Sequence, residues 1–87
     1  MSGESYAESI RKIVIENGVE VATLERIKEM VLLHRQRNNL LRPDDFNPTR
    51  SSKTDKIWEH RTRSALKALR HSGEAALIDR ARYRFFL

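Results

Sequence analysis

The start of the chain combines a helical period with a short alternating segment. Apolar side chains recur at the spacing of one face of a helix with about 3.6 residues per turn: Tyr6, Ile10, Ile13 and Val14. This pattern predicts a helix over residues 4–16. Gly18 follows it and suits the left-handed conformation that ends many helices. Residues 19–21 alternate apolar and polar side chains, which predicts a short strand.

A second helix is predicted to begin at Thr23, whose hydroxyl suits the N-cap position. Its inward face is formed by three apolar residues: Leu24, Ile27 and Val31. Residues 30–33 are all apolar, although successive side chains on a helix lie about 100° apart and cannot all face one core. Leu32 or Leu33 must therefore be covered, most simply by the following loop, and otherwise by another domain or a partner protein.

Residues 37–55 follow no regular apolar period and hold both prolines of the chain. They predict a long irregular loop, which in a compact domain is usually functional or partly disordered. Leu40, Leu41 and Phe46 are the apolar residues expected to anchor it. Pro43 allows one short helical turn, because proline suits the first position of a helix.

The third predicted helix, residues 56–71, has two chemically different faces. Thr54 or Asp55 is expected to cap it and Gly73 to end it. Small and apolar side chains share the face expected to enter the core: Trp58, Thr62, Ala65, Leu66 and Leu69. Basic side chains recur on the roughly opposite face: Lys56, His60, Arg63, Lys67 and Arg70. Glu59 is the only acidic residue in this helix.

After Gly73 the helical period gives way to the alternation of strands. Residues 75–78 predict one strand and residues 79–82 a turn. A second strand with one apolar face follows, on the evidence of alternating large side chains: Tyr83, Phe85 and Leu87. The two strands form a hairpin that carries three arginines at or near its tip: Arg80, Arg82 and Arg84.

This order of elements is that of a winged helix–turn–helix domain, mainly α with a small β-hairpin. We expect residues 1–87 to form one such domain, because a chain of this length leaves no room for a second. The short strand should pair with the hairpin, which closes the open side of the helical core. The third helix and the hairpin tip, or wing, should then share one side of the molecule.

Charge is concentrated in the same two elements. The net charge is +5 and the pI is near 10.1. Residues 1–49 hold seven basic and eight acidic side chains, whereas residues 50–87 hold ten basic and four acidic ones. Clustered lysine and arginine at a pI above about 9 is typical of proteins that bind polyanions, and an ordinary solvated surface is the alternative.

Element order and charge together predict a domain that binds double-stranded DNA, with the third helix in the major groove. The wing, residues 79–84, should contact the backbone or the minor groove. Arg63 and Lys67 lie mid-helix and should reach the groove, where an arginine fork can bind guanine O6 and N7 together. The predicted DNA-binding residues are Lys56, His60, Arg63, Lys67, Arg70, Arg80, Arg82 and Arg84.

Other functions remain open for these residues. The basic helix face can be merely solvated, and basic residues on a hairpin also protect exposed strand edges. Winged helices also serve in docking or dimerisation without touching DNA. That alternative gains weight if Leu32, Leu33 and Phe86 form one exposed apolar patch.

Residues 57–73 (IWEHRTRSALKALRHSG) and 78–85 (IDRARYRF) carry a family resemblance. They resemble the last helix and wing of the N-terminal winged-helix domains of Mrr-like modification-dependent restriction endonucleases. HARE-type helix–turn–helix domains are similar in layout. The family usually has glycine near the wing turn, where this chain has Ala81, and its nuclease domain is absent. The resemblance implies a DNA-recognition module of a larger restriction or transcription-regulatory system.

The sequence also argues against several kinds of chemistry. Without cysteine the chain has no disulfide or thiolate site, and His60 and His71 lie too far apart on a helix to share a metal. We expect no metal, no cofactor and no enzyme activity, because Asp44 in a loop and Glu59 on a helix do not form a nuclease metal site.

No apolar run suits a membrane span or signal peptide. We therefore expect a cytoplasmic protein with no membrane partner, associated with the nucleoid if bacterial.

Overall fold

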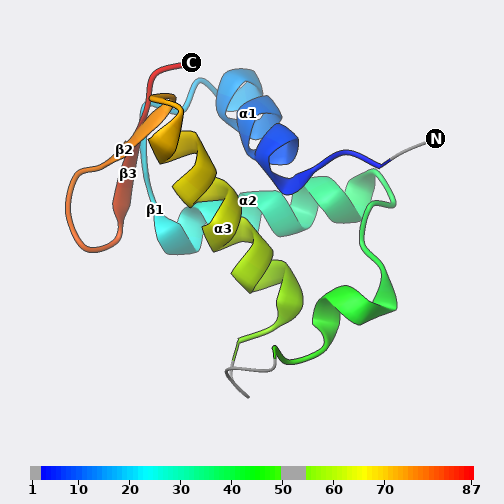
Figure 1. The fold of residues 1–87 in the computed structure, drawn as a ribbon. Helices are drawn as coiled ribbons and strands as arrows, with labels where there is room; N and C mark the ends of the chain where they lie inside the picture. The colour runs from blue at the N-terminus through cyan, green and yellow to red at the C-terminus, as the bar shows by residue number, and fades with distance from the viewer. Residues whose placement is uncertain (1–2, 50–54) are drawn as a thin grey trace.

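The computed structural model describes residues 3–49 and 55–87. Its elements along the chain are α1 (Tyr6–Asn17), β1 (Val21–Thr23), α2 (Leu24–Arg37), the 3-10 turn η1 (Pro43–Phe46), α3 (Ile57–His71), β2 (Ala75–Leu77) and β3 (Arg82–Phe85). Figure 1 shows the three helices packed together, with the strands gathered at one end of them. The predicted order of elements is confirmed.

Helix α1 starts two residues later than predicted and ends one residue later, at Asn17. The Ser5 hydroxyl accepts a hydrogen bond from the Glu8 amide (3.1 Å) and acts as the N-cap, so the helix begins at Tyr6 instead of residue 4. At the other end Gly18 takes a left-handed φ of 61°. That conformation is strained for residues with a side chain, which explains the glycine at this helix end.

Strand β1 lies two residues further along than the predicted segment 19–21. The Val19 amide still donates to the Val14 carbonyl at the end of α1 (2.9 Å), so the extended segment begins only at Val21. The prediction that Thr23 caps α2 is confirmed, because its hydroxyl accepts from the Arg26 amide (3.2 Å).

The apolar run in α2 is divided between core and surface. Val31 is fully buried, and Met30 and Leu32 are half-buried against the core. Leu33 stays 49% exposed. Packing against the core itself therefore covers Leu32, and Leu33 remains a surface residue.

The loop after α2 contains the short helical turn expected at Pro43, η1. Leu41 packs against the core, whereas Phe46 is exposed and does not anchor the loop as expected. Pro48 forms an isolated antiparallel bridge with Lys56, which brings the two ends of the later part of the loop together. Residues 50–54 of the predicted loop lie outside the described residues.

Helix α3 has its predicted inward face but a different cap. All five residues expected in the core are buried: Trp58, Thr62, Ala65, Leu66 and Leu69. Its N-cap is Lys56, whose amide donates to the Glu59 carboxylate (3.1 Å). The predicted cap at Asp55 is therefore wrong, and Thr54 lies outside the described residues. Gly73, with a φ of 83°, follows the helix as expected.

The three strands form one antiparallel sheet in the order β1-β3-β2, as the predicted pairing of the short strand with the hairpin requires. Tyr83 of the central strand faces Ala22 on one side and Leu77 on the other. Strand β3 is shorter than predicted, because its partner strands end opposite Arg84 and Phe85. Leu87 has no strand beside it and is exposed, so it does not extend the apolar face.

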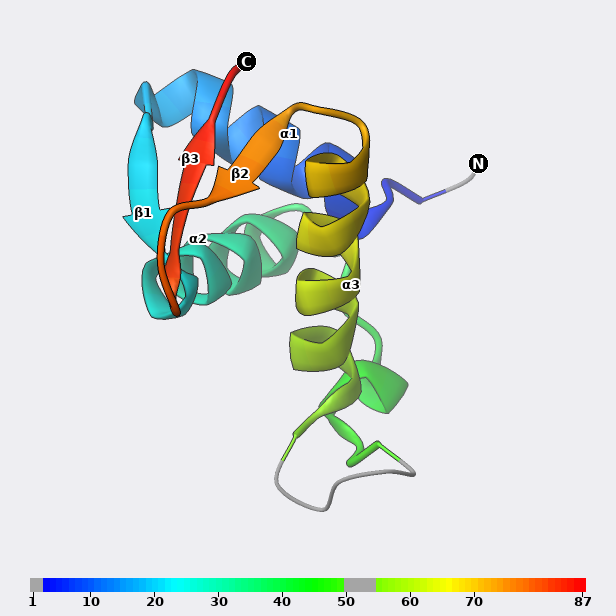
Figure 2. The same ribbon diagram turned by 60° about the vertical axis from the view of Figure 1, so that its left-hand side comes forward.

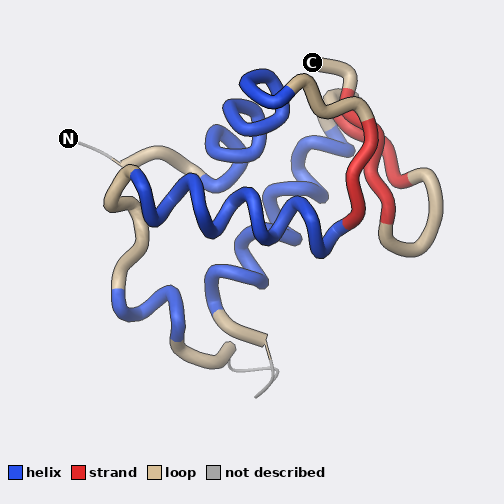
Figure 3. The backbone as a smooth tube through the Cα atoms, turned by 180° about the vertical axis from the view of Figure 1, so that it is seen from behind, coloured by secondary structure: helices blue, strands red, loops and turns tan. Residues whose placement is uncertain are grey.

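One hydrophobic core joins the helices to the inner side of this sheet. Ile10 of α1, Ile27 of α2, Leu66 of α3 and Phe85 of β3 all belong to it. Seen from behind in Figure 3, α2 runs directly on from a strand, and the strands lie together beside the helices. Three helices with a small sheet of this order make a winged helix fold.

Candidate nucleic-acid interface

The outward side of α3 is basic and open. Lys56, His60, Lys67 and Arg70 are exposed, and none forms an ion pair with a residue of the described segments. We call these four residues the α3 basic face. Helical geometry places them opposite the buried residues of the same helix, so core packing directs them outward.

Arg63 differs from the other predicted contacts on α3. Its guanidinium is half-buried and forms an ion pair with Asp55, just before the helix. The hydrogen bond from Arg63 lowers the pKa of the Asp55 carboxyl, so the pair is fully charged near neutral pH. A nucleic acid that uses Arg63 must first compete with this carboxylate.

Glu59, the only carboxylate on α3, is neutralised from inside the molecule. The Lys28 ammonium of α2 lies 2.8 Å from one carboxylate oxygen, and the Lys56 amide donates to the other. The contact with Lys28 lowers the pKa of Glu59, and burial opposes the shift only in part. No sequence pattern links Lys28 to Glu59, because only the crossing of α2 and α3 brings them together.

The wing arginines point away from the core. Strand alternation places Arg82 and Arg84 on the side of β3 opposite buried Phe85 and half-buried Tyr83. We call the side of the sheet that carries Arg82 and Arg84 the outer sheet face. Arg80 is exposed in the preceding turn. Within the described segments Arg80 and Arg84 form no ion pair, whereas Arg82 lies 2.7 Å from the Asp79 carboxylate.

Asp79 organises the wing turn. One of its carboxylate oxygens accepts from the Ala81 amide (3.2 Å) and the other from Arg82 Nε (2.8 Å). The Ala81 carbonyl in turn accepts from the Leu24 amide (2.6 Å), which ties the turn to the start of α2. No residue of this turn has a positive φ, so Ala81 fits where the resembling family usually has glycine.

A shallow groove connects α3 with the sheet. It is lined by Lys67, Arg70 and His71 on the last turns of α3, and by Ala75–Leu77 of β2. Ala76 pairs with Arg84 and so belongs to the outer sheet face. The α3 basic face and the outer sheet face therefore meet at this groove, and Figure 2 shows β2 between β3 and α3. The sequence did not indicate His71 as part of this surface.

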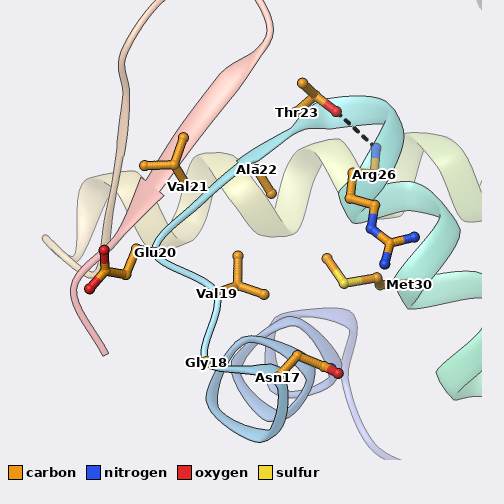
Figure 4. A pocket seen from close by; sticks show the side chains of 9 residues that line it. All are labelled: Asn17, Gly18, Val19, Glu20, Val21, Ala22, Thr23, Arg26 and Met30. Carbon is orange, nitrogen blue, oxygen red and sulfur yellow. Dashed lines mark hydrogen bonds between the residues drawn. The ribbon is translucent and has the colours of Figure 1, made fainter.

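A different groove follows the outer edge of β1, away from the α3 basic face. Figure 4 shows it between the end of α1 and the start of α2, with Val19, Ala22, Arg26 and Met30 among its lining residues. Its apolar part and single arginine do not resemble a polyanion site.

The described residues hold no group of three or more histidine, cysteine or acidic side chains placed to bind a metal ion. Among the helices described, none has both the length and the apolar character needed to cross a membrane.

The chain matches no protein-family model, no curated protein and no solved structure.

Proposed function

We propose that the protein binds double-stranded DNA, with α3 in the major groove and the wing on the backbone or in the minor groove. In this arrangement Lys67 and Arg70 contact phosphates or base edges, and Arg80 and Arg84 contact the neighbouring backbone. Arg63 reaches a base only after it leaves Asp55.

The observation that carries this proposal is that the α3 basic face and the outer sheet face meet at the groove between the last turns of α3 and β2. The cations of these two faces are exposed and mostly free of ion pairs within the described segments, whereas nearby Glu59 and Asp79 are each held by a basic side chain. Cations that keep no internal partner are available to neutralise phosphates and to release their counterions.

The resemblance to Mrr-like domains supports a more specific form of the proposal. In that form the domain serves as the recognition part of a restriction or regulatory system and distinguishes modified from unmodified bases. The direct test compares binding to duplexes of identical sequence with and without methylated cytosine or adenine. Equal affinity for all of them contradicts this specific form and leaves general DNA binding intact.

The general proposal is tested by fluorescence anisotropy with a duplex of about 20 base pairs at about 50 and 200 mM salt. Each phosphate neutralised contributes about −0.9 to the slope of log K against log salt, so five contacts lower affinity about 500-fold over this range. Arg70→Ala should weaken binding, and Arg26→Ala, on the opposite groove, is the matched control. Absence of binding at the lower salt concentration contradicts the proposal.

A protein-docking role is the second candidate, and exposed Leu33 and Phe86 are the observations in its favour. Phe86 is 59% exposed just after β3, where its amide donates to the Glu74 carbonyl (2.9 Å). Leu33 lines a groove between α1 and α2 instead. The lining of that groove does not include Phe86, which weakens the form of this alternative in which Leu33 and Phe86 make one patch.

A further inference from the structure

A second basic site lies beside η1, apart from the α3 basic face and the wing. It is a pocket between the N-terminal segment, the end of α2, the following loop and α3. Three arginines from three different segments line it, together with two acidic residues: Arg35, Arg42, Arg61, Asp45 and Glu4. We call it the arginine pocket.

Arg35 is unusual because its charge is buried without a carboxylate partner. The residue is only 6% exposed, yet it forms no ion pair with any described residue. Its Nη1 donates to the Glu4 carbonyl (3.0 Å) and the Ser9 hydroxyl (2.8 Å), and its guanidinium lies 3.9 Å from the centre of the Tyr6 ring. Its Nε is buried and has no partner. A buried cation without a counter-charge is costly, and a bound anion would relieve that cost.

The nearby Glu4 carboxylate does not supply the missing charge. One of its oxygens accepts from Lys12 (2.5 Å), and the other lies within hydrogen-bonding distance of Ser9 (2.6 Å) and His34 (2.7 Å). Both oxygens are thus directed toward groups other than Arg35.

The other groups in the arginine pocket leave a net positive charge. Asp45 is 5% exposed, accepts from the Arg42 amide (2.8 Å) and lies 3.6 Å from Arg61 Nη1. The Arg42 guanidinium forms no ion pair within the described segments. Together with Lys12, which pairs with Glu4, the three arginines make four basic side chains against two carboxylates, so two positive charges remain unmatched.

We propose that the arginine pocket binds the phosphate group of a small phosphorylated molecule. Arg42 and Arg61 would contact its oxygens from the rim, while Arg35 would supply charge from the floor. A phosphate group offers three terminal oxygens and up to two negative charges, which match the three guanidinium groups and the unmatched charge. A carboxylate offers only two oxygens and one charge.

The test is a titration of the ¹⁵N-labelled full chain with sodium phosphate, followed by amide NMR shifts, with ionic strength held constant by sodium chloride. We expect saturable shifts centred on residues 39–45 and Arg61. Arg42→Ala and Arg61→Ala remove exposed side chains and should each weaken binding about ten-fold. Arg70→Ala, on the α3 basic face, is the matched control and should change it less than about two-fold.

Three results would overturn the proposal. Shifts confined to α3 and the wing would mean that phosphate binds only the DNA-facing surface. An undiminished affinity in both Arg42→Ala and Arg61→Ala would remove the arginine pocket from the site. Sodium acetate that binds as well as phosphate would make it a carboxylate site. The same variants assayed with duplex DNA keep the two proposals separate, because only Arg70→Ala should weaken DNA binding.

Discussion

Residues of one type play different roles on α3 because their surroundings differ. Lys67 and Arg70 extend outward without ion pairs among the described residues, whereas Arg63, on the same predicted ladder, is held by Asp55. Arg61, which belongs to no predicted set, faces Asp45 in the arginine pocket. A helical repeat orders such side chains by angle but does not identify their partners.

Lys67 provides the simplest test of the α3 basic face. Lys67→Ala should weaken binding to all duplexes about equally and reduce the salt slope by roughly one, because it removes one phosphate contact. Anisotropy titrations at several salt concentrations measure both effects. An unchanged slope would place Lys67 outside the interface.

Asp55 should restrain DNA binding through Arg63. Asp55→Asn removes the ion pair and one negative charge, so we expect DNA affinity to rise about two- to five-fold, the range typical of an exposed pair. The gain should disappear in the Asp55→Asn, Arg63→Ala double variant. If the single variant binds no more tightly than the original chain, Arg63 does not contact the nucleic acid.

Glu4 should make stability dependent on pH in the acid range. Burial alone would raise the pKa of its carboxyl, but hydrogen bonds from Lys12, Ser9 and His34 outweigh burial and lower the pKa from 4.5 to about 2. The native state therefore binds this proton less readily than the unfolded chain. The stabilisation is complete above pH 4.5 and is lost as the pH falls toward 2.

Urea unfolding at several pH values tests this linkage. Glu4→Gln should lower the free energy of unfolding at pH 7 by on the order of 1–3 kcal/mol and flatten its decline below about pH 4.5. A variant whose acid dependence equals that of the original chain would show that other carboxyls determine it.

At the scale of elements, α3 combines a buried stripe with a basic face in one helix. The stripe was predictable because the helical period alone sorts side chains into inward and outward sets. The N-cap of α3 was not predictable, because a tertiary bridge between Pro48 and Lys56 sets where the chain turns into the helix. The same holds for β1, whose start depends on how α1 ends.

A Leu66→Ala variant shows how much the buried stripe of α3 contributes to the free energy of unfolding. Its side chain has 0% exposure, so Leu66→Ala should cost about 2–5 kcal/mol through lost burial and a residual cavity. Ser64→Ala on the exposed side of α3 is the matched control, with an expected change within about 0.5 kcal/mol. Chemical denaturation measures both, and a Leu66→Ala variant of unchanged stability would mean that α3 packs through another face.

At the scale of the whole molecule, the basic surface depends on elements that are distant in sequence. β1 pairs with β3, and Lys28 of α2 neutralises Glu59 of α3. The wing turn is tied to α2 through the bond from Leu24 to Ala81. These contacts hold the sheet and α3 in one arrangement, with β2 beside α3 and the wing turn against the start of α2.

Simultaneous contact can be measured with a double variant. Lys67→Ala with Arg84→Ala should reduce the salt slope by about two and combine the two losses of binding free energy nearly additively, because the side chains contact separate phosphates. Arg84→Ala alone should reduce the slope by about one. A slope that Arg84→Ala leaves unchanged would mean that the wing does not touch the DNA.

Local periods and composition were enough to predict the order of elements, the buried stripe of α3 and the segregation of charge. The packing of the elements determines which charged side chains remain without an ion pair among the described residues. Only the packing of separate elements turns Glu59 toward Lys28 and collects three arginines beside η1. Such contacts depend on the distances between elements, and those distances are set by the packing of the whole core.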